Sequence, residues 1–332
     1  SQVGLCVGFV AVFAVGPFAG IPGAALAAFA GAGLVPLLDS IGMEQLAKVG
    51  GQWGPLRAIT SFSYAAMCVL SGALVAAGGA IVIGPLYGVA ALVMVAGTIG
   101  LQTAPALHHA ARPARSEAIA EIERSEIAGT NAEIAIAGDW RDRFGTVNLA
   151  FQQSPGLFTF LMLSLLVNIG AGLFYAYGSF RIQEVGGDAA AVAFSGTVAA
   201  AVEIPFFLAG GAIAARLGMR TLFALGLIAM GVCSVGYAVI DTPFALAIVR
   251  SLVGVGFACT LLASVLSIRA LVPAALQATG QALYQSVSFG LSIAIAALVG
   301  GIIYGELGAV PLFLLSGAIM FGAIPFAWRV LR

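Results

Sequence analysis

One acid inside an apolar stretch is the strongest chemical signal in the sequence. In "GTVAAAVEIPFFLAGGAIAARLGMR", residues 196–220, Glu203 stands among apolar residues, and Arg216 and Arg220 close the stretch. A charge at the centre of a bilayer costs at least about 2.5–3.5 kcal/mol, and such residues usually mark a pathway for ions or substrates. Burial favours the protonated form of a carboxylate and a nearby arginine favours the ionised form. We therefore expect Glu203 to load and release a proton; the alternative is a structural acid that holds helices together.

Three further charged residues stand at positions where they could act on a solute. Arg250 lies about seven residues, or roughly 10 Å, inside one end of its apolar run. It could extend to the membrane surface, or reach Glu203 or an anionic group on a substrate. Asp39 and Arg57 stand at the ends of neighbouring runs. They could form a gate on the cytoplasmic side, although anchoring at the membrane surface alone would explain Arg57.

Uncharged polar residues occupy two other apolar runs. Gln281 shares a helix face with Tyr284 and Gln285, because the spacings are three and four residues. With Asn168, these donors and acceptors suit a hydroxylated ligand such as a sugar, or ordinary hydrogen bonds between helices. Tyr175 lies near the end of its run, as does Tyr177. We expect these two tyrosines to belong to the aromatic belt at a membrane surface.

The elements that must position these residues are membrane-spanning helices. The chain has 332 residues, of which 61% are hydrophobic and 8% charged, against roughly 25% charged residues in soluble domains. A helix needs about 20 apolar residues to cross the hydrocarbon, and the sequence predicts an all-α polytopic bundle of about ten such helices. Their expected positions are 2–18, 20–38, 57–78, 80–104, 156–178, 189–214, 219–240, 243–268, 277–303 and 307–328. Glu203 would then lie roughly 20 Å into its span, near the midplane of the membrane.

The distribution of charge predicts how the chain crosses the membrane. With alternating spans, twelve Lys and Arg residues fall on the cytoplasmic side and Arg181 alone falls clearly outside, as the positive-inside rule requires. Both ends of the chain would then be cytoplasmic. Residues 105–155 hold 12 of the 28 charged residues and are expected to be a solvated cytoplasmic connector.

Enzyme and cofactor chemistry have little support. The four cysteines lie in apolar runs without a CxxC pair, and the two histidines, His108 and His109, lie together in the connector. A phosphate-binding loop is missing from the printed sequence, so we expect an ion gradient rather than ATP to supply energy. The sequence predicts no enzyme, no cofactor, no metal and no nucleic-acid partner.

Three stretches of the chain resemble the major facilitator superfamily. The segment "PLLDSIGMEQLAKVGGQWGPLRAITSFSY", residues 36–64, is similar to the fourth-to-fifth helix passage of lactose-permease-like and phenylpropionate-transporter-like proteins. The stretch 196–220, with its Glu-Ile-Pro and Arg-x-Gly-x-Arg, is similar to the eighth helix of sugar efflux transporters. "LVPAALQATGQALYQSVSFGLS", residues 271–292, is similar to the tenth-to-eleventh helix passage of both groups.

The resemblance implies a two-bundle secondary transporter. Its fold would comprise the remainder of an N-terminal bundle over 1–104, the connector over 105–155 and a six-helix bundle over 156–332, with the first two helices of a six-plus-six parent absent. Such proteins move a sugar or a small organic acid across the inner membrane, often with protons, and are usually monomers. Val253 and Gly256 stand where lactose-permease-like proteins carry a His and a Glu for proton relay. A truncated or non-transporting sensor or scaffold of the same fold is the alternative.

Overall fold

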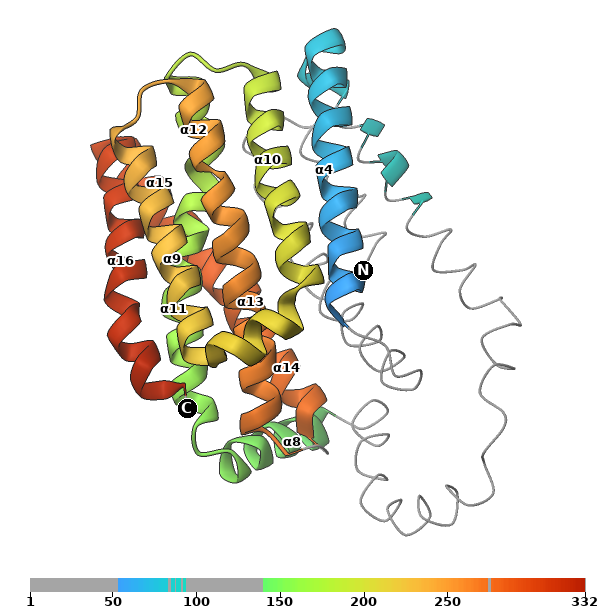
Figure 1. Cartoon of the computed structure of the whole chain (residues 1–332), viewed down its shortest axis with the longest axis vertical. Coiled ribbons are helices and arrows are strands. Elements are labelled where there is room, and N and C mark those ends of the chain that lie inside the picture. Colours follow the sequence, from blue (N-terminus) through green and yellow to red (C-terminus); the bar gives the residue numbers. More distant parts are fainter. Residues whose placement is uncertain are drawn as a thin grey trace.

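The described part of the chain is a bundle of α-helices (Figure 1). A computed structural model describes residues 53–82, 140–273 and 276–331, together with the short pieces 85–86, 88–90 and 92–93. Seven helical stretches in these residues are long and apolar enough to cross a membrane. The prediction of an all-α membrane bundle is therefore confirmed for the described residues.

From α8 to α16 the helices follow one another with short connections. The bounds of the described helices are α4 Trp53–Gly78, η1 Ala80–Val82, α8 Trp140–Gln153, α9 Leu157–Glu184, α10 Ala189–Leu208, α11 Gly210–Val239, α12 Pro243–Val249, α13 Ser251–Leu271, α14 Gln277–Gln285, η3 Ser286–Leu291, α15 Ser292–Leu307 and α16 Ala309–Val330. The η3 segment is π-helical and joins α14 to α15 without a loop. As a result, α12 with α13, and α14 with η3 and α15, each make one candidate span.

The described residues contain seven candidate spans, which does not support the prediction of about ten. One is α4, and the other six lie between residues 157 and 330. The spans predicted at 2–18 and 20–38 fall outside the described residues. The span predicted at 80–104 is described only as η1 and three short pieces, so a count of ten remains a prediction.

The span predicted at 189–214 is interrupted by a bend. Pro205 lies inside α10 and lacks the amide hydrogen that would continue the helical ladder. The helix ends at Leu208, and α11 begins after Ala209, at Gly210. Glu203 therefore lies five residues from the end of α10, closer to that end than the predicted midplane position would place it.

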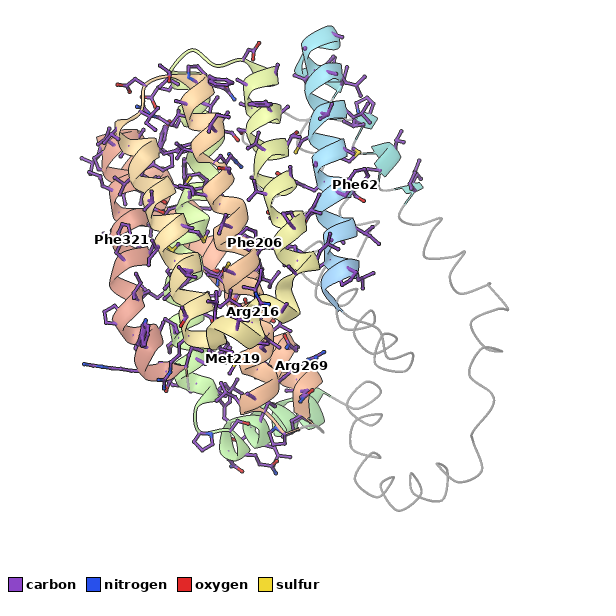
Figure 2. The ribbon with its side chains drawn as sticks, in the orientation of Figure 1. Phe62, Phe206, Arg216, Met219, Arg269 and Phe321 are labelled. Atoms are coloured by element: carbon purple, nitrogen blue, oxygen red, sulfur yellow. The ribbon has the colours of Figure 1, made fainter. Side chains whose placement is uncertain are left out.

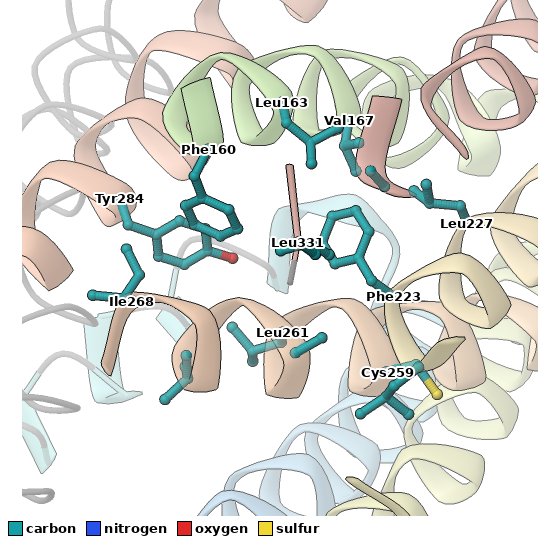
Figure 3. Packing of buried hydrophobic residues seen from close by; sticks show 14 of the residues in the cluster. Phe160, Leu163, Val167, Phe223, Leu227, Cys259, Leu261, Ile268, Tyr284 and Leu331 are labelled. Atoms are coloured by element: carbon teal, nitrogen blue, oxygen red, sulfur yellow. The ribbon is translucent and has the colours of Figure 1, made fainter. Parts of the chain in front are cut away.

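Two buried clusters hold the bundle together. In one, the rings of Phe160 on α9 and Tyr284 on α14 stack with their centres 6.0 Å apart (Figure 3). In the other, Phe174 on α9 packs edge-on against Tyr237 on α11 and Phe313 on α16, at 4.6 and 5.8 Å. These contacts pack α9 against α14, α11 and α16.

The two ends of the bundle differ in charge. Arg216 and Arg269 lie at the lower end as drawn (Figure 2), the end that also holds α8 and the C-terminus. At the upper end, Arg181 forms an ion pair with Asp241 over 2.5 Å and donates hydrogen bonds to the carbonyls of Tyr237 and Ile240. Arg181 thus joins α9 to the last turn of α11.

Candidate functional site

A cavity of about 410 Å³ lies between α4 and the helices of the C-terminal part. This volume is within the range of roughly 300–1,000 Å³ that small-molecule sites occupy. The lining residues come from α4, α9, α10, α13 and η3, and from the junction of α12 and α13. They are Arg57, Thr60, Ser61, Tyr64, Tyr175, Gly196, Ala199, Glu203, Arg250, Val253, Phe257 and Phe289. The cavity therefore brings together the acid and two of the arginines that the sequence singles out.

Glu203 is half-buried on the wall of the cavity and is held by the opposite helix. Its Oε2 accepts a hydrogen bond of 2.8 Å from Oγ of Ser61, which is buried on α4. The two residues are 142 positions apart in the chain, so this bond joins α4 to the neighbouring α10 at the wall of the cavity. Ser61 was not predicted as a site residue, because a serine in an apolar run carries no charge to single it out.

Arg57 lies on the cavity and not only at the membrane surface. Its guanidinium carbon is 5.9 Å from the ring centre of Phe207 and 5.5 Å from that of Phe257. Its Nε is buried and has no hydrogen-bond partner among the described residues. The predicted gate pair of Arg57 with Asp39 stays untested, since Asp39 falls outside the described residues.

Arg250 also turns towards the cavity. It stands at the break between α12 and α13, is only 8% exposed, and lies over the ring of Phe174 at 5.7 Å. In the part of the chain that the structure describes, its Nε and Nη1 are buried without a hydrogen-bond partner. Of the two predicted positions for Arg250, the structure favours the one facing inwards.

The charges on the cavity wall are not paired with one another. Among the described residues, the ion pairs within 4.0 Å are those of Arg181 with Glu184 and Asp241. Glu203 thus forms no ion pair with Arg57 or Arg250. The lining carries two guanidinium groups and one carboxylate, so it is suited to bind an anion or to exchange a proton.

Asn168 and Tyr284 line a second, smaller cavity of about 30 Å³. The amide of Asn168 donates to the carbonyl of Ser164 in its own helix at 2.8 Å. Tyr284 is 3% exposed and stacks on Phe160. The small cavity has room for about one water molecule, so these two residues contact the interior of the bundle and not the Glu203 cavity.

Gln281 and Gln285 are buried at 7% and 8% exposure, and neither lines the Glu203 cavity. Gln281 Nε2 lies 3.5 Å from the carbonyl of Val265 on α13, while its Oε1 is buried without a partner among the described residues. For Gln281, this contact agrees with the second use that the sequence left open, which is bonding between helices. Their shared helix face was predictable, but the neighbour that it contacts depends on tertiary packing.

Three aromatic residues line both cavities, and none of them was predicted as a site residue. They are Tyr175 on α9, Phe257 on α13 and Phe289 on η3. The belt position predicted for Tyr175 assumed a run that ends near 178, whereas α9 continues to Glu184. Tyr175 therefore lies about 13 Å inside the end of its helix, at the level of the cavity.

The described residues hold no group of three His, Cys, Asp or Glu residues that could bind a metal ion. In comparisons with known proteins, residues 3–315 match the family described as MFS_1 like family. A comparison with curated proteins gives no match. The family match covers α4 and most of the helices around the cavity, so both walls of the site lie within it.

Proposed function

Because the chain belongs to the MFS_1 like family, a family of the transporter class, we propose that it is a secondary active transporter. It moves a small polar solute, a sugar or a small organic acid, across the inner membrane by alternating access. One observation carries the proposal: the cavity between α4 and the C-terminal helices holds a carboxylate and two arginines within helices of membrane-spanning length. Charged residues at such positions mark substrate and ion pathways.

Alternating access requires that two bundles separate along the cavity. We assign α4 to the first bundle and α9 to α16 to the second, as the resemblance of the sequence implies. The hydrogen bond from Ser61 to Glu203 crosses from one to the other. Opening this side of the cavity would break that bond and expose the carboxylate to water.

Glu203 is the residue that we propose to couple transport to protons. It is the acid among the cavity-lining residues that the structure describes. The relay of lactose-permease-like proteins is not available, since Val253 lines the cavity where that resemblance places a histidine. Coupling through Glu203 requires only that its carboxylate is exposed to water in one conformation and hydrogen-bonded to Ser61 in the other.

The experiment replaces Glu203 by glutamine in the full-length protein in proteoliposomes. Counterflow first identifies a transported solute from a panel of sugars and small carboxylic acids. Glu203→Gln is then expected to abolish pH-driven accumulation of that solute while its exchange continues, because glutamine keeps a hydrogen-bonding group but carries no proton to release. Glu306→Gln, an exposed acid on α15 away from the cavity lining, should behave like the unmodified protein.

Accumulation by Glu203→Gln at the unmodified level would show that coupling does not use this residue. If no solute of the panel exchanges, transport itself is not supported. The non-transporting sensor or scaffold of the same fold would then be the better description.

A further inference from the structure

We propose that the solute carries an oxyanion group, such as a carboxylate, which Arg250 binds, and a planar apolar body that packs against the aromatic wall of the cavity. The inference rests on the proposed function and deepens it by naming the class of substrate. It is drawn from the surroundings of Arg250, the charge of the lining and the types of side chain that the lining offers.

A second buried arginine, Arg181, shows which partners a buried guanidinium group has elsewhere in this protein. Arg181 and Arg250 are almost equally buried, at 7% and 8% exposure. Arg181 has Asp241 and Glu184 as acidic partners and two carbonyls as acceptors. Burying a charge is unfavourable unless it is paired and hydrogen-bonded. Arg250 has no acidic partner among the described residues: it lies over the face of Phe174 and beside the side chain of Tyr237. Its Nε and Nη1 have no hydrogen-bond partner there, so a negative group from a ligand would complete its surroundings.

The charge of the lining points to the same class of ligand. Two arginines, Arg57 and Arg250, and one acid, Glu203, line the cavity. Glu203 can offset at most one of the two positive charges, so at least one is left without a counter-charge in the lining. A monoanion would neutralise the site, whereas a neutral sugar would leave a buried charge without a partner. Arginine also offers the planar fork of donors that matches a carboxylate in two hydrogen bonds.

The remaining lining residues favour a flat apolar body over a sugar. Four of them are aromatic: Tyr64, Tyr175, Phe257 and Phe289. Aromatic side chains stack on or contact planar groups with their faces and edges. The amide side chains that would suit a polyhydroxylated ligand lie elsewhere, because Asn168, Gln281 and Gln285 do not line this cavity.

The test measures binding to the full-length protein by isothermal titration calorimetry, with two pairs of probes of equal shape. The pairs are benzoate with benzamide and phenylacetate with phenylacetamide, so only the negative charge differs within a pair. At least one acid is expected to bind tenfold or more tightly than its amide. Arg250→Gln should weaken binding of that acid by tenfold or more, and Arg216→Gln, an exposed arginine outside the cavity lining, should leave it unchanged.

A second variant guards against a misfolded Arg250→Gln protein. Arg250→Lys keeps the charge but loses the two-bond fork, so it should bind the acid with intermediate affinity while eluting as a monodisperse species. Equal binding of acid and amide, no binding of either acid, or full acid binding by a folded Arg250→Gln would each overturn the inference.

Transport assays separate this inference from the function on which it rests. A protein that accumulates a neutral sugar, and whose accumulation is unaffected by either acid, would overturn the inference and leave the transporter in place. A protein that binds an acid through Arg250 but neither exchanges nor accumulates it would support the ligand class and overturn the transport function.

Discussion

At the scale of single residues, the position of Arg250 relative to Glu203 depends on a glycine. Gly254 stands four residues after Arg250, so both lie on one face of the chain around the start of α13. A Cβ on Gly254 would lie 2.2 Å from the carbonyl oxygen of Ala199 and 3.4 Å from the backbone nitrogen of Glu203. The absence of a side chain therefore lets α13 approach α10 directly beside the acid.

Replacing Gly254 tests whether the site requires close packing of α13 against α10. Because the obstacle to a new Cβ is backbone, Gly254→Ala must push α13 away from α10. Overpacking of this kind typically costs about 1–3 kcal/mol. We expect a lower thermal unfolding midpoint in detergent and loss of solute exchange.

The matched control is Gly211→Ala on α11, where a new Cβ would meet no atom within 4 Å. Alanine is a better helix former than glycine by up to about 1 kcal/mol, so this control should be as stable as the unmodified protein or slightly more so. A Gly254→Ala protein with unchanged midpoint and exchange would contradict the role given to the glycine.

At the scale of helices, small residues allow α4 and α10 to pack closely. A Cβ on Gly72 of α4 would lie 2.4 Å from Cβ of Ala193, and one on Gly196 of α10 would lie 3.0 Å from Sγ of Cys68. The two helices run side by side in Figure 1. Small residues let membrane helices approach closely, and movement of the bundles would have to open this contact.

The same geometry allows the contact to be locked. An ideal Cβ on Gly196 lies 3.8 Å from Cβ of Cys68, and this separation is about the mean found in disulfides. In the variant Gly196→Cys, mild oxidation is expected to link α4 to α10. The link should stop exchange of the solute, and reduction should restore it.

The link is detected as two fragments that stay together on a non-reducing gel after the chain is cut at a protease site introduced into residues 105–139. Gly196→Cys combined with Cys68→Ala separates the effect of the new side chain from that of the disulfide. Full exchange by an oxidised, fully linked protein would show that transport does not require α4 and α10 to part.

The apolar runs predicted the helices well where the backbone is continuous. The runs at 57–78 and 307–328 correspond to α4 and α16 within a few residues. Hydropathy did not reveal the breaks at Ala209 and Arg250 or the π-helical turn of η3, because each lies inside a stretch that is apolar on average.

The site was predictable only in its charged members. Glu203 and Arg250 could be found because a charge inside an apolar run is costly and therefore conspicuous. Phe257 and Phe289 could not, since the chain has 21 phenylalanines and composition does not tell a cavity wall from a core. Their position depends on how α13 and η3 face α4, which no local pattern determines.

At the scale of the whole molecule, positive charge gathers at one end of the bundle. Arg216 and Arg269 lie towards the lower end (Figure 2), and Arg216 and Arg220 flank Gly218, where α11 is kinked. Arg329 is in the last turn of α16, which ends beside the C-terminus at the lower end (Figure 1). At the upper end, Arg181 is accompanied by the acids Glu184 and Asp241. Since Lys and Arg near the ends of spans are retained in the cytoplasm, we expect the lower end to be cytoplasmic.

Labelling of single cysteines measures this orientation. In a variant whose four native cysteines are replaced, Asp241→Cys presents a thiol at the upper end, where the aspartate side chain is 81% exposed. Arg216→Cys presents one at the lower end. A maleimide that cannot cross the membrane should label Asp241→Cys in intact cells and Arg216→Cys only after the cells are permeabilised. The reverse pattern would place the arginine-rich end outside. Arg57, which we assign to the cytoplasmic side, would then also have to be assigned to the outer side.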